Sequence, residues 1–216
     1  MLLNIASHKG EKSGGRIRQK NEEIILAAAE VEFAAHGFKG ATMNSIALHA
    51  GLPKSNIHYY FKNKLKLYAE VLANIIDLWD SALNELKSDD DPAEALTIYL
   101  ATKMRYAREN PLASRIFAKE ILSGGPRLDD YFNDEYRRWF KTRTQVFKDW
   151  AAQGKIDNID PAHIIFLLWS STQHYSDFTL QISAAMNKTE LDAKDFDKAT
   201  QSLTRIVLQG IGVKSL

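Results

Sequence analysis

Cysteine is absent from this sequence of 216 residues, which excludes disulfides, thiolate zinc sites and cysteine nucleophiles. Long apolar runs are absent too. The run Ile164–Trp169 has six residues, whereas a helix that spans a membrane needs about 20. We therefore expect a soluble, cytoplasmic protein without a membrane partner.

The motifs of common enzyme sites are also missing. The sequence has no GxSxG, no glycine-rich phosphate loop and no HExxH, and its six histidines form no i, i+4 pair of the kind that binds metal on a helix. The acidic run Asp89–Asp91 favours a helix cap over a magnesium site. We expect no enzymatic activity, no catalytic residue, no cofactor and no resident metal.

Charge of both signs is plentiful but unevenly distributed. Residues 1–72 contain ten Lys and Arg against six Glu, and the rest of the chain is net acidic. Residues 1–16 show little helical periodicity and include Ser13-Gly14-Gly15, so we expect a flexible basic arm there. It either lies along DNA phosphates or is a solvated terminus. Its apolar run Leu2–Ala6 precedes the basic residues, which argues against a signal peptide.

Residues 42–64 have the pattern of two short helices joined by a tight turn. Thr42 suits the N-cap of the first helix, Gly51 suits the turn, and Pro53 suits the start of the second helix. Four positions of the second helix are all polar, whereas an ordinary helical hairpin inside a core would have a mixture of residue types facing inward at these positions. The four polar residues are Lys54, Ser55, Asn56 and His58. The pattern favours a DNA-reading helix-turn-helix over an ordinary hairpin.

A dense pattern surrounds these two helices. It consists of Gly37-Phe38, Gly40, Thr42, Ile46-Ala47, Ala50-Gly51-Leu52, Lys54-Ser55, Ile57 to Phe61, Asn63-Lys64 and Leu67. This pattern resembles the DNA-binding domain of TetR-family bacterial repressors. The resemblance implies a homodimer on double-stranded operator DNA and a C-terminal domain that binds a small effector. It also implies roles for single residues: Lys54, Ser55 and Asn56 at base edges, and Thr42, Tyr59 and Lys64 near phosphates. His58 stands where many family members carry tyrosine.

The remaining sequence predicts helix after helix and no strand. Asp91-Pro92, Asn110-Pro111 and Asp160-Pro161 each supply a cap and a first helical residue, and glycines at 124, 125 and 154 end helices. We expect nine helices, at residues 17–36, 43–50, 54–61, 64–87, 92–109, 111–122, 127–153, 161–186 and 193–211. The predicted fold is all-α, with a DNA-binding domain at 17–63 and a ligand-binding and dimerisation domain at 64–216.

The helix that begins at Pro161 carries the most informative stripe of the second domain. Its members recur at three- and four-residue steps and are Phe166, Trp169, Gln173, Asp177 and Leu180. If this face is buried, the amide and the carboxylate need partners. A planar polar ligand stacked on Trp169 would satisfy both. Alternatively, the two groups bond to neighbouring side chains or across a dimer interface.

Three further segments extend the resemblance through the C-terminal domain. They are Ala113 to Phe117, Glu120 to Pro126 and Ile159 to Phe178, and they look like the pyrimidine-utilisation branch of the same repressor family. This implies an effector of uracil or thymine type, with Trp169, Gln173, Tyr175 and Asp177 as its binding residues. Trp79 is either a second wall of that cavity or a residue of the core. The alternatives are a lipophilic acid or drug-like effector and, in a different class, a helical interaction module without DNA binding.

Overall fold

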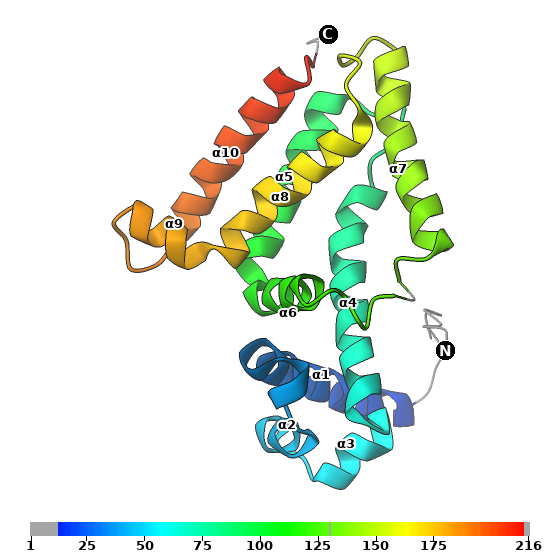
Figure 1. The fold of residues 1–216 in the computed structure, drawn as a ribbon, viewed down its shortest axis with the longest axis vertical. Helices are drawn as coiled ribbons and strands as arrows, with labels where there is room; N and C mark the ends of the chain where they lie inside the picture. Colours follow the sequence, from blue (N-terminus) through cyan, green and yellow to red (C-terminus); the bar gives the residue numbers. More distant parts are fainter. Residues whose placement is uncertain (1–12, 130, 214–216) are drawn as a thin grey trace. The chain divides into compact units, whose positions relative to one another are not determined.

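The computed structural model describes residues 13–129 and 131–213. These residues form ten α-helices and no strand (Figure 1). The helices are α1 (Ser13–Gly40), α2 (Met43–Ala50), α3 (Lys54–Phe61), α4 (Lys64–Asn84), α5 (Pro92–Glu109), α6 (Pro111–Leu122), α7 (Asp134–Ala152), α8 (Pro161–Asp177), α9 (Thr179–Ala185) and α10 (Ala193–Gly210). None of these helices combines the length and apolarity that crossing a bilayer requires. The all-α prediction is confirmed.

The chain divides into two compact units that do not follow chain order. The first contains the residues up to Asp77 and the segment Arg115–Tyr131, and the second contains Leu78–Ser114 and the residues from Phe132 onward. Helices α4 and α6 therefore each contribute to both units. The functional boundary predicted between residues 63 and 64 stays a prediction.

The first unit is built on a small apolar core that positions α2 and α3. Ile25, Phe33, Ile46, Ile57 and Leu67 are all at most 1% exposed. They come from α1, α2, α3 and α4, so each of these helices buries one face in the same core. The short helices α2 and α3 have eight residues each and depend on this packing, because isolated helices of that length are unstable in water.

The second unit has a larger core made by helices from distant parts of the chain. Its largest fully buried members include Trp150, Tyr99 and Phe147, which come from α5 and α7. Helix α5 packs against both α8 and α10, and Leu96, Ile165 and Val207 from these three helices join one cluster. This packing fixes the orientation of α8 within the second unit, and α8 carries most of the predicted ligand residues.

Two predicted helices, at 127–153 and 161–186, differ most from their bounds in the structure. The helix expected at 161–186 ends at Asp177, because Phe178 leaves the helical conformation (φ −114°, ψ 27°) before α9 begins. The hydroxyl of Thr179 donates to the backbone carbonyls of Tyr175 and Ser176, which favours a break in the helix. This break explains why ten helices are found where nine were expected.

The helix expected at 127–153 begins later, at Asp134. Residues 127–129 and 131–133 form turns, and the Asn133 side chain accepts hydrogen bonds from the backbone N–H groups of Glu135 and Tyr136. Asn133 is therefore the N-cap. At the other end of the chain, α1 begins at Ser13, earlier than predicted, while residues 1–12 of the expected arm lie outside the described residues.

Candidate DNA-binding surface and effector site

The turn between α2 and α3 is fixed by local chemistry. The Thr42 hydroxyl accepts a hydrogen bond from the backbone N–H of Ser45 at 3.0 Å, and the Ser45 side chain accepts one from the Thr42 N–H. This reciprocal pair is a capping box. Gly51 then adopts a left-handed conformation (φ 63°, ψ 27°), which glycine occupies at little cost. The predicted roles of Thr42 as a cap and Gly51 as a turn residue are confirmed.

Helix α3 exposes the residues predicted to read DNA. Ile57 is fully buried and anchors the helix, whereas Lys54 and Ser55 are exposed and Asn56 is half-buried. Within the described part of the chain, the side chains of Lys54, Ser55 and Asn56 have no hydrogen-bond or ion-pair partner. Their donors and acceptors are therefore available to an external partner.

The residues that follow on α3 divide between surface and support. Tyr59 is 73% exposed, while the hydroxyl of Tyr60 accepts a hydrogen bond from the Asn21 amide of α1 at 3.1 Å. His58 is exposed, and its Nδ1 lies 3.0 Å from the backbone oxygen of Lys62. Tyr59 therefore faces outward from α3, and the hydrogen bond of Tyr60 connects α3 to α1.

Lys64 makes contacts within the first unit that the sequence analysis did not predict. Its ammonium donates to the backbone oxygen of Ala41 at 2.9 Å and lies 4.6 Å from the centre of the Phe38 ring. It therefore joins the start of α4 to the segment that precedes α2. Its contact with phosphate stays a prediction, but its structural role is one that the sequence analysis missed.

A buried carboxylate ties α6 to the same unit. Glu120 is 3% exposed, accepts a hydrogen bond from the Tyr68 hydroxyl at 2.9 Å and pairs with Arg127 at 3.2 Å. The guanidinium of Arg127 also stacks 3.8 Å from the centre of the Phe38 ring. Burial and the hydrogen bond to Glu120 raise the pKa of Tyr68. These contacts connect α6 to both α1 and α4 within the first unit.

In the second unit, the predicted ligand residues of α8 lie in a row but already have partners. The Gln173 amide donates to one oxygen of Asp177 at 3.0 Å, and the Ser114 hydroxyl donates to the other. This matches the alternative in which the amide and the carboxylate bond to neighbouring side chains. Trp169 is half-buried and packs beside Phe140 of α7.

Two other members of the predicted set point elsewhere. Tyr175 packs against Phe196 of α10, in a cluster separate from the one that contains Trp169. Leu180 lies on α9 and is 87% exposed, so the stripe expected from Phe166 to Leu180 is interrupted by the break at Phe178. The structure therefore groups Trp169, Gln173 and Asp177 along α8 but places Tyr175 and Leu180 away from them.

Trp79, the predicted second wall, contacts a buried lysine that the sequence analysis missed. The Lys103 ammonium of α5 lies 3.8 Å from the centre of the Trp79 ring, and Lys103 is only 1% exposed. Burial lowers the pKa of Lys103 to about 7, and the negative charge of Asp80 opposes this shift only in part. A signal existed in the sequence: Leu96, Leu100 and Lys103 share one helical face, so a cation interrupts an apolar stripe.

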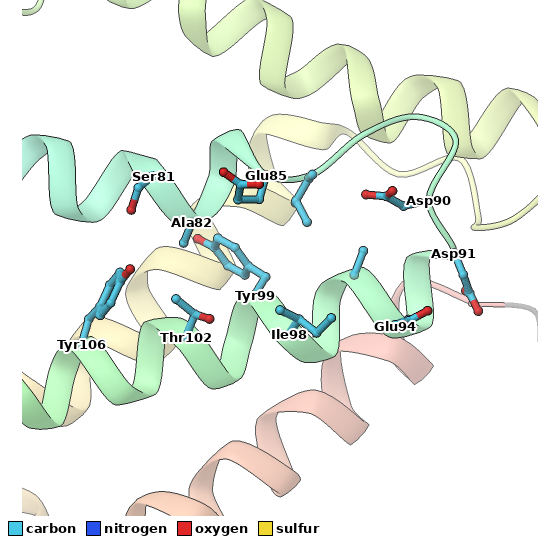
Figure 2. Close-up of a pocket in the computed structure, with 12 residues that line it drawn as sticks. Ser81, Ala82, Glu85, Asp90, Asp91, Glu94, Ile98, Tyr99, Thr102 and Tyr106 are labelled. Carbon is cyan, nitrogen blue, oxygen red and sulfur yellow. The ribbon is translucent and has the colours of Figure 1, made fainter.

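A pocket of about 560 Å³ lies beside this cluster, between the end of α4 and α5 (Figure 2). Its apolar lining includes Ala82, Ile98 and Tyr99, with Tyr99 extending from α5 toward α4. The lining also includes four carboxylates, which are Glu85, Asp90, Asp91 and Glu94. Asp91 accepts a hydrogen bond from the Ala93 N–H and caps α5, which confirms its predicted role.

Comparisons with known proteins agree along the chain. Residues 25–71 match the family described as bacterial regulatory proteins, tetR family, and residues 72–214 match the C-terminal region described as YcdC-like protein. The HTH-type transcriptional regulator RutR of Escherichia coli (strain K12) is 36% identical over 190 residues, covering 88% of this chain and 90% of that protein. The HTH-type transcriptional repressor NicS of Pseudomonas putida is 33% identical over 117 residues, or 53% of this chain and 55% of that protein.

Solved structures show the same fold at lower sequence identity. A proposed transcriptional regulator from Streptomyces coelicolor superposes with a TM-score of 0.71 at 22% identity, covering 90% of this chain and 99% of that one. A proposed fatty acid metabolism regulator from Clostridium perfringens gives a TM-score of 0.70 at 21% identity, covering 88% and 100%. At these identities the likeness concerns the fold alone.

Proposed function

This chain belongs to the TetR family of bacterial regulatory proteins, and from that premise we propose that it binds operator DNA as a homodimer under the control of a small effector. The matched relatives are transcriptional regulators, so the chain is a regulator and not an enzyme. The observation that carries the DNA-binding proposal is the set of unpaired polar side chains on α3 above a fully buried Ile57.

The chemistry of α3 suits the edges of base pairs. The Lys54 ammonium donates to the acceptors of guanine, and the Asn56 amide both donates and accepts, as adenine requires. The Ser55 hydroxyl donates or accepts. Thr42, His58 and Tyr59 flank these residues and are placed to contact phosphates, and such contacts fix the register of the protein on DNA. Lys64 adds positive charge at the same end of the unit.

A dimer is needed because one recognition helix reads few base pairs. Two copies related by a two-fold axis read two half-sites about 34 Å apart. Apolar side chains suited to such an interface lie exposed on α8 and α10, among them Phe166, Leu167 and Ile206, which are 47%, 49% and 62% exposed. We propose that these helices form a four-helix interface with those of the partner copy.

The effector site that we propose lies in the second unit, with Trp79, Trp169, Gln173 and Asp177 as its residues. A uracil- or thymine-type effector is supported by the pattern of Ile159 to Phe178 and by the paired amide and carboxylate, which offer a donor and acceptors to an imide ring. Such a ligand has to replace the Gln173–Asp177 hydrogen bond. Tyr175, packed on α10, is a weaker candidate.

Helix α4 provides a route from effector to DNA. It begins at Lys64, beside the recognition element in sequence, and continues without interruption to Asn84 with Trp79 on it. We propose that ligand contact at Trp79 changes the position of α4, so that one spacing of the recognition helices fits the operator and the other does not.

Selection from random-sequence duplex DNA tests this function directly. The proposal expects enrichment of palindromic sites whose half-sites lie about 10 base pairs apart. Sedimentation of the protein at micromolar concentration should give a dimer. If no sequence is enriched at moderate salt, or if the protein sediments as a monomer, the proposal fails and a helical interaction module becomes the better description.

A further inference from the structure

Three hydrogen-bond donors without an acceptor occur together in the interior of the second unit. The indole N–H of Trp79 and the hydroxyl of Tyr99 are buried, and neither donates to an acceptor within the described residues. The Lys103 ammonium contacts the face of the Trp79 ring, and no hydrogen bond or ion pair to a described residue engages it. Tyr99 lies one turn before Lys103 on α5, and Asp80 acts electrostatically on both.

The groups around this cluster do not supply the missing acceptor. Asp80 of α4 stabilises the charged form of Lys103, but burial outweighs it. Trp169 of α8 approaches the Tyr99 oxygen as a donor, and this opposes the rise in the pKa of Tyr99, but it leaves the hydroxyl hydrogen without a partner. Burial raises the pKa of Tyr136 of α7 to about 12, so this residue supplies no negative charge to Lys103.

Such an arrangement is costly for a protein that only needs a packed core. Lysine is almost never fully buried unless it is paired, and an unpaired buried donor costs about 1–3 kcal/mol, with a charge costing more. A methionine at position 103 fits nearly the same volume without this cost. The cluster is therefore suited to an acceptor that arrives from outside.

We propose that Trp79, Tyr99 and Lys103 bind the anionic oxygen of a planar effector, an aromatic or heteroaromatic ring that carries a carboxylate or a comparable oxyanion. All three groups donate, so the complementary group only accepts, and a hydrogen bond from an ammonium to an anionic oxygen is about twice as strong as a neutral one. The inference rests on the proposed effector site and adds the charge of its ligand.

The location of the cluster also separates it from the neighbouring pocket. Tyr99 lines that pocket, which brings open space to one edge of the donors, but the carboxylates of Glu85, Asp90, Asp91 and Glu94 line it as well. Negative charge there disfavours an anion. The anionic oxygen is therefore placed at Lys103, against the Trp79 ring, and not among these carboxylates.

The test compares three probes with the purified full chain by calorimetric titration and thermal shift. The probes are orotate, which is uracil with a carboxylate, uracil itself, and benzoate. The wild-type chain should bind orotate or benzoate at least tenfold more tightly than uracil. A preference for orotate over benzoate identifies a pyrimidine acid, and the reverse identifies an aromatic acid.

The variant Lys103→Met should lose at least tenfold in affinity for the preferred acid. The matched control Arg108→Met, which removes an exposed cation from the same helix, should bind like wild type. If Lys103→Met does not fold, Tyr99→Phe decides the question, because it deletes one donor and should weaken acid binding severalfold without changing the charge.

Three results overturn the inference: equal acid affinity in wild type and the folded variant, uracil binding as tightly as the acids, or no binding of any probe. Operator binding is measured separately by fluorescence anisotropy. If the regulator proposal is wrong, this measurement shows no DNA binding while the acids still bind. If only the role of Lys103 is wrong, DNA binding is intact and ligand affinity does not depend on Lys103.

Discussion

The two units of the molecule each contain a lysine without an ionic partner among the described residues, in opposite surroundings. Lys54 on α3 is exposed to water, whereas Lys103 on α5 is 1% exposed. Water solvates the first charge at little cost, so an unpaired surface lysine needs no special explanation. The second charge lacks that solvation, so its presence demands a compensating benefit. The comparison teaches that a missing partner is informative only for the buried lysine. The proposed contact of Lys54 with DNA rests instead on its place on α3.

Removing a buried charge that does have partners should produce the largest effect. Glu120→Ala leaves Arg127 and the Tyr68 hydroxyl without their shared acceptor in the first unit. We expect a loss of about 3–5 kcal/mol in the free energy of unfolding, measured by urea denaturation. A loss below 1 kcal/mol would show that the network contributes little.

Removing the buried charge without partners should have the opposite sign. Lys103→Met should raise the free energy of unfolding at pH 7 by about 1–4 kcal/mol, because it replaces an unpaired cation by an apolar side chain of similar volume. Equilibrium denaturation of the two proteins gives this value. A clear loss of stability would mean that Lys103 has a stabilising partner.

The difference in the free energy of unfolding between wild type and Lys103→Met should depend on pH. Burial lowers the pKa of Lys103 to about 7 from its model-peptide value of 10.5, so between these values the unfolded chain binds more protons than the folded one. Wild-type stability should therefore rise as the pH increases from 7 toward 10.5, and the advantage of Lys103→Met should shrink over the same range. Denaturation at pH 7, 8 and 9 checks this, and a constant difference would contradict it.

Helix caps should have smaller and equal effects in the two units. Thr42→Ala removes the cap of α2, and Asp91→Ala removes that of α5. Each should lower the free energy of unfolding by about 1 kcal/mol. The exposed control Arg137→Ala, whose pair with Asp134 is 72% and 79% exposed, should change it by less than about 0.5 kcal/mol. Equal changes in the free energy of unfolding for all three substitutions would show that the caps contribute no specific stability.

The sequence predicted the elements whose signals are local. Thr42, Gly51 and the Asp91-Pro92 and Asp160-Pro161 pairs mark helix boundaries through their own backbone and side-chain chemistry, and the structure has helices there. The polar face of α3 was predictable for the same reason, since the three- and four-residue spacing within one short helix determines which side chains face the core.

The features that the sequence did not predict depend on residues far apart in the chain. Asp177 receives a hydrogen bond from Ser114, 63 positions away, and Trp79 meets Lys103 across two helices. Lys64 was predicted near phosphate, yet the backbone oxygen of Ala41 binds its ammonium. Periodicity shows which residues share a face, but it does not show what packs against that face.

Charge reversal on α3 tests the central claim most directly. Fluorescence anisotropy would compare operator affinity at several salt concentrations for wild type, Lys54→Glu and the control Lys148→Glu on the exposed face of α7. We predict that Lys54→Glu binds at least tenfold more weakly with a shallower salt dependence, because at least one cationic contact to DNA is lost, and that the control binds like wild type. Equal affinity of all three proteins would contradict the assignment of α3 as the DNA-reading helix.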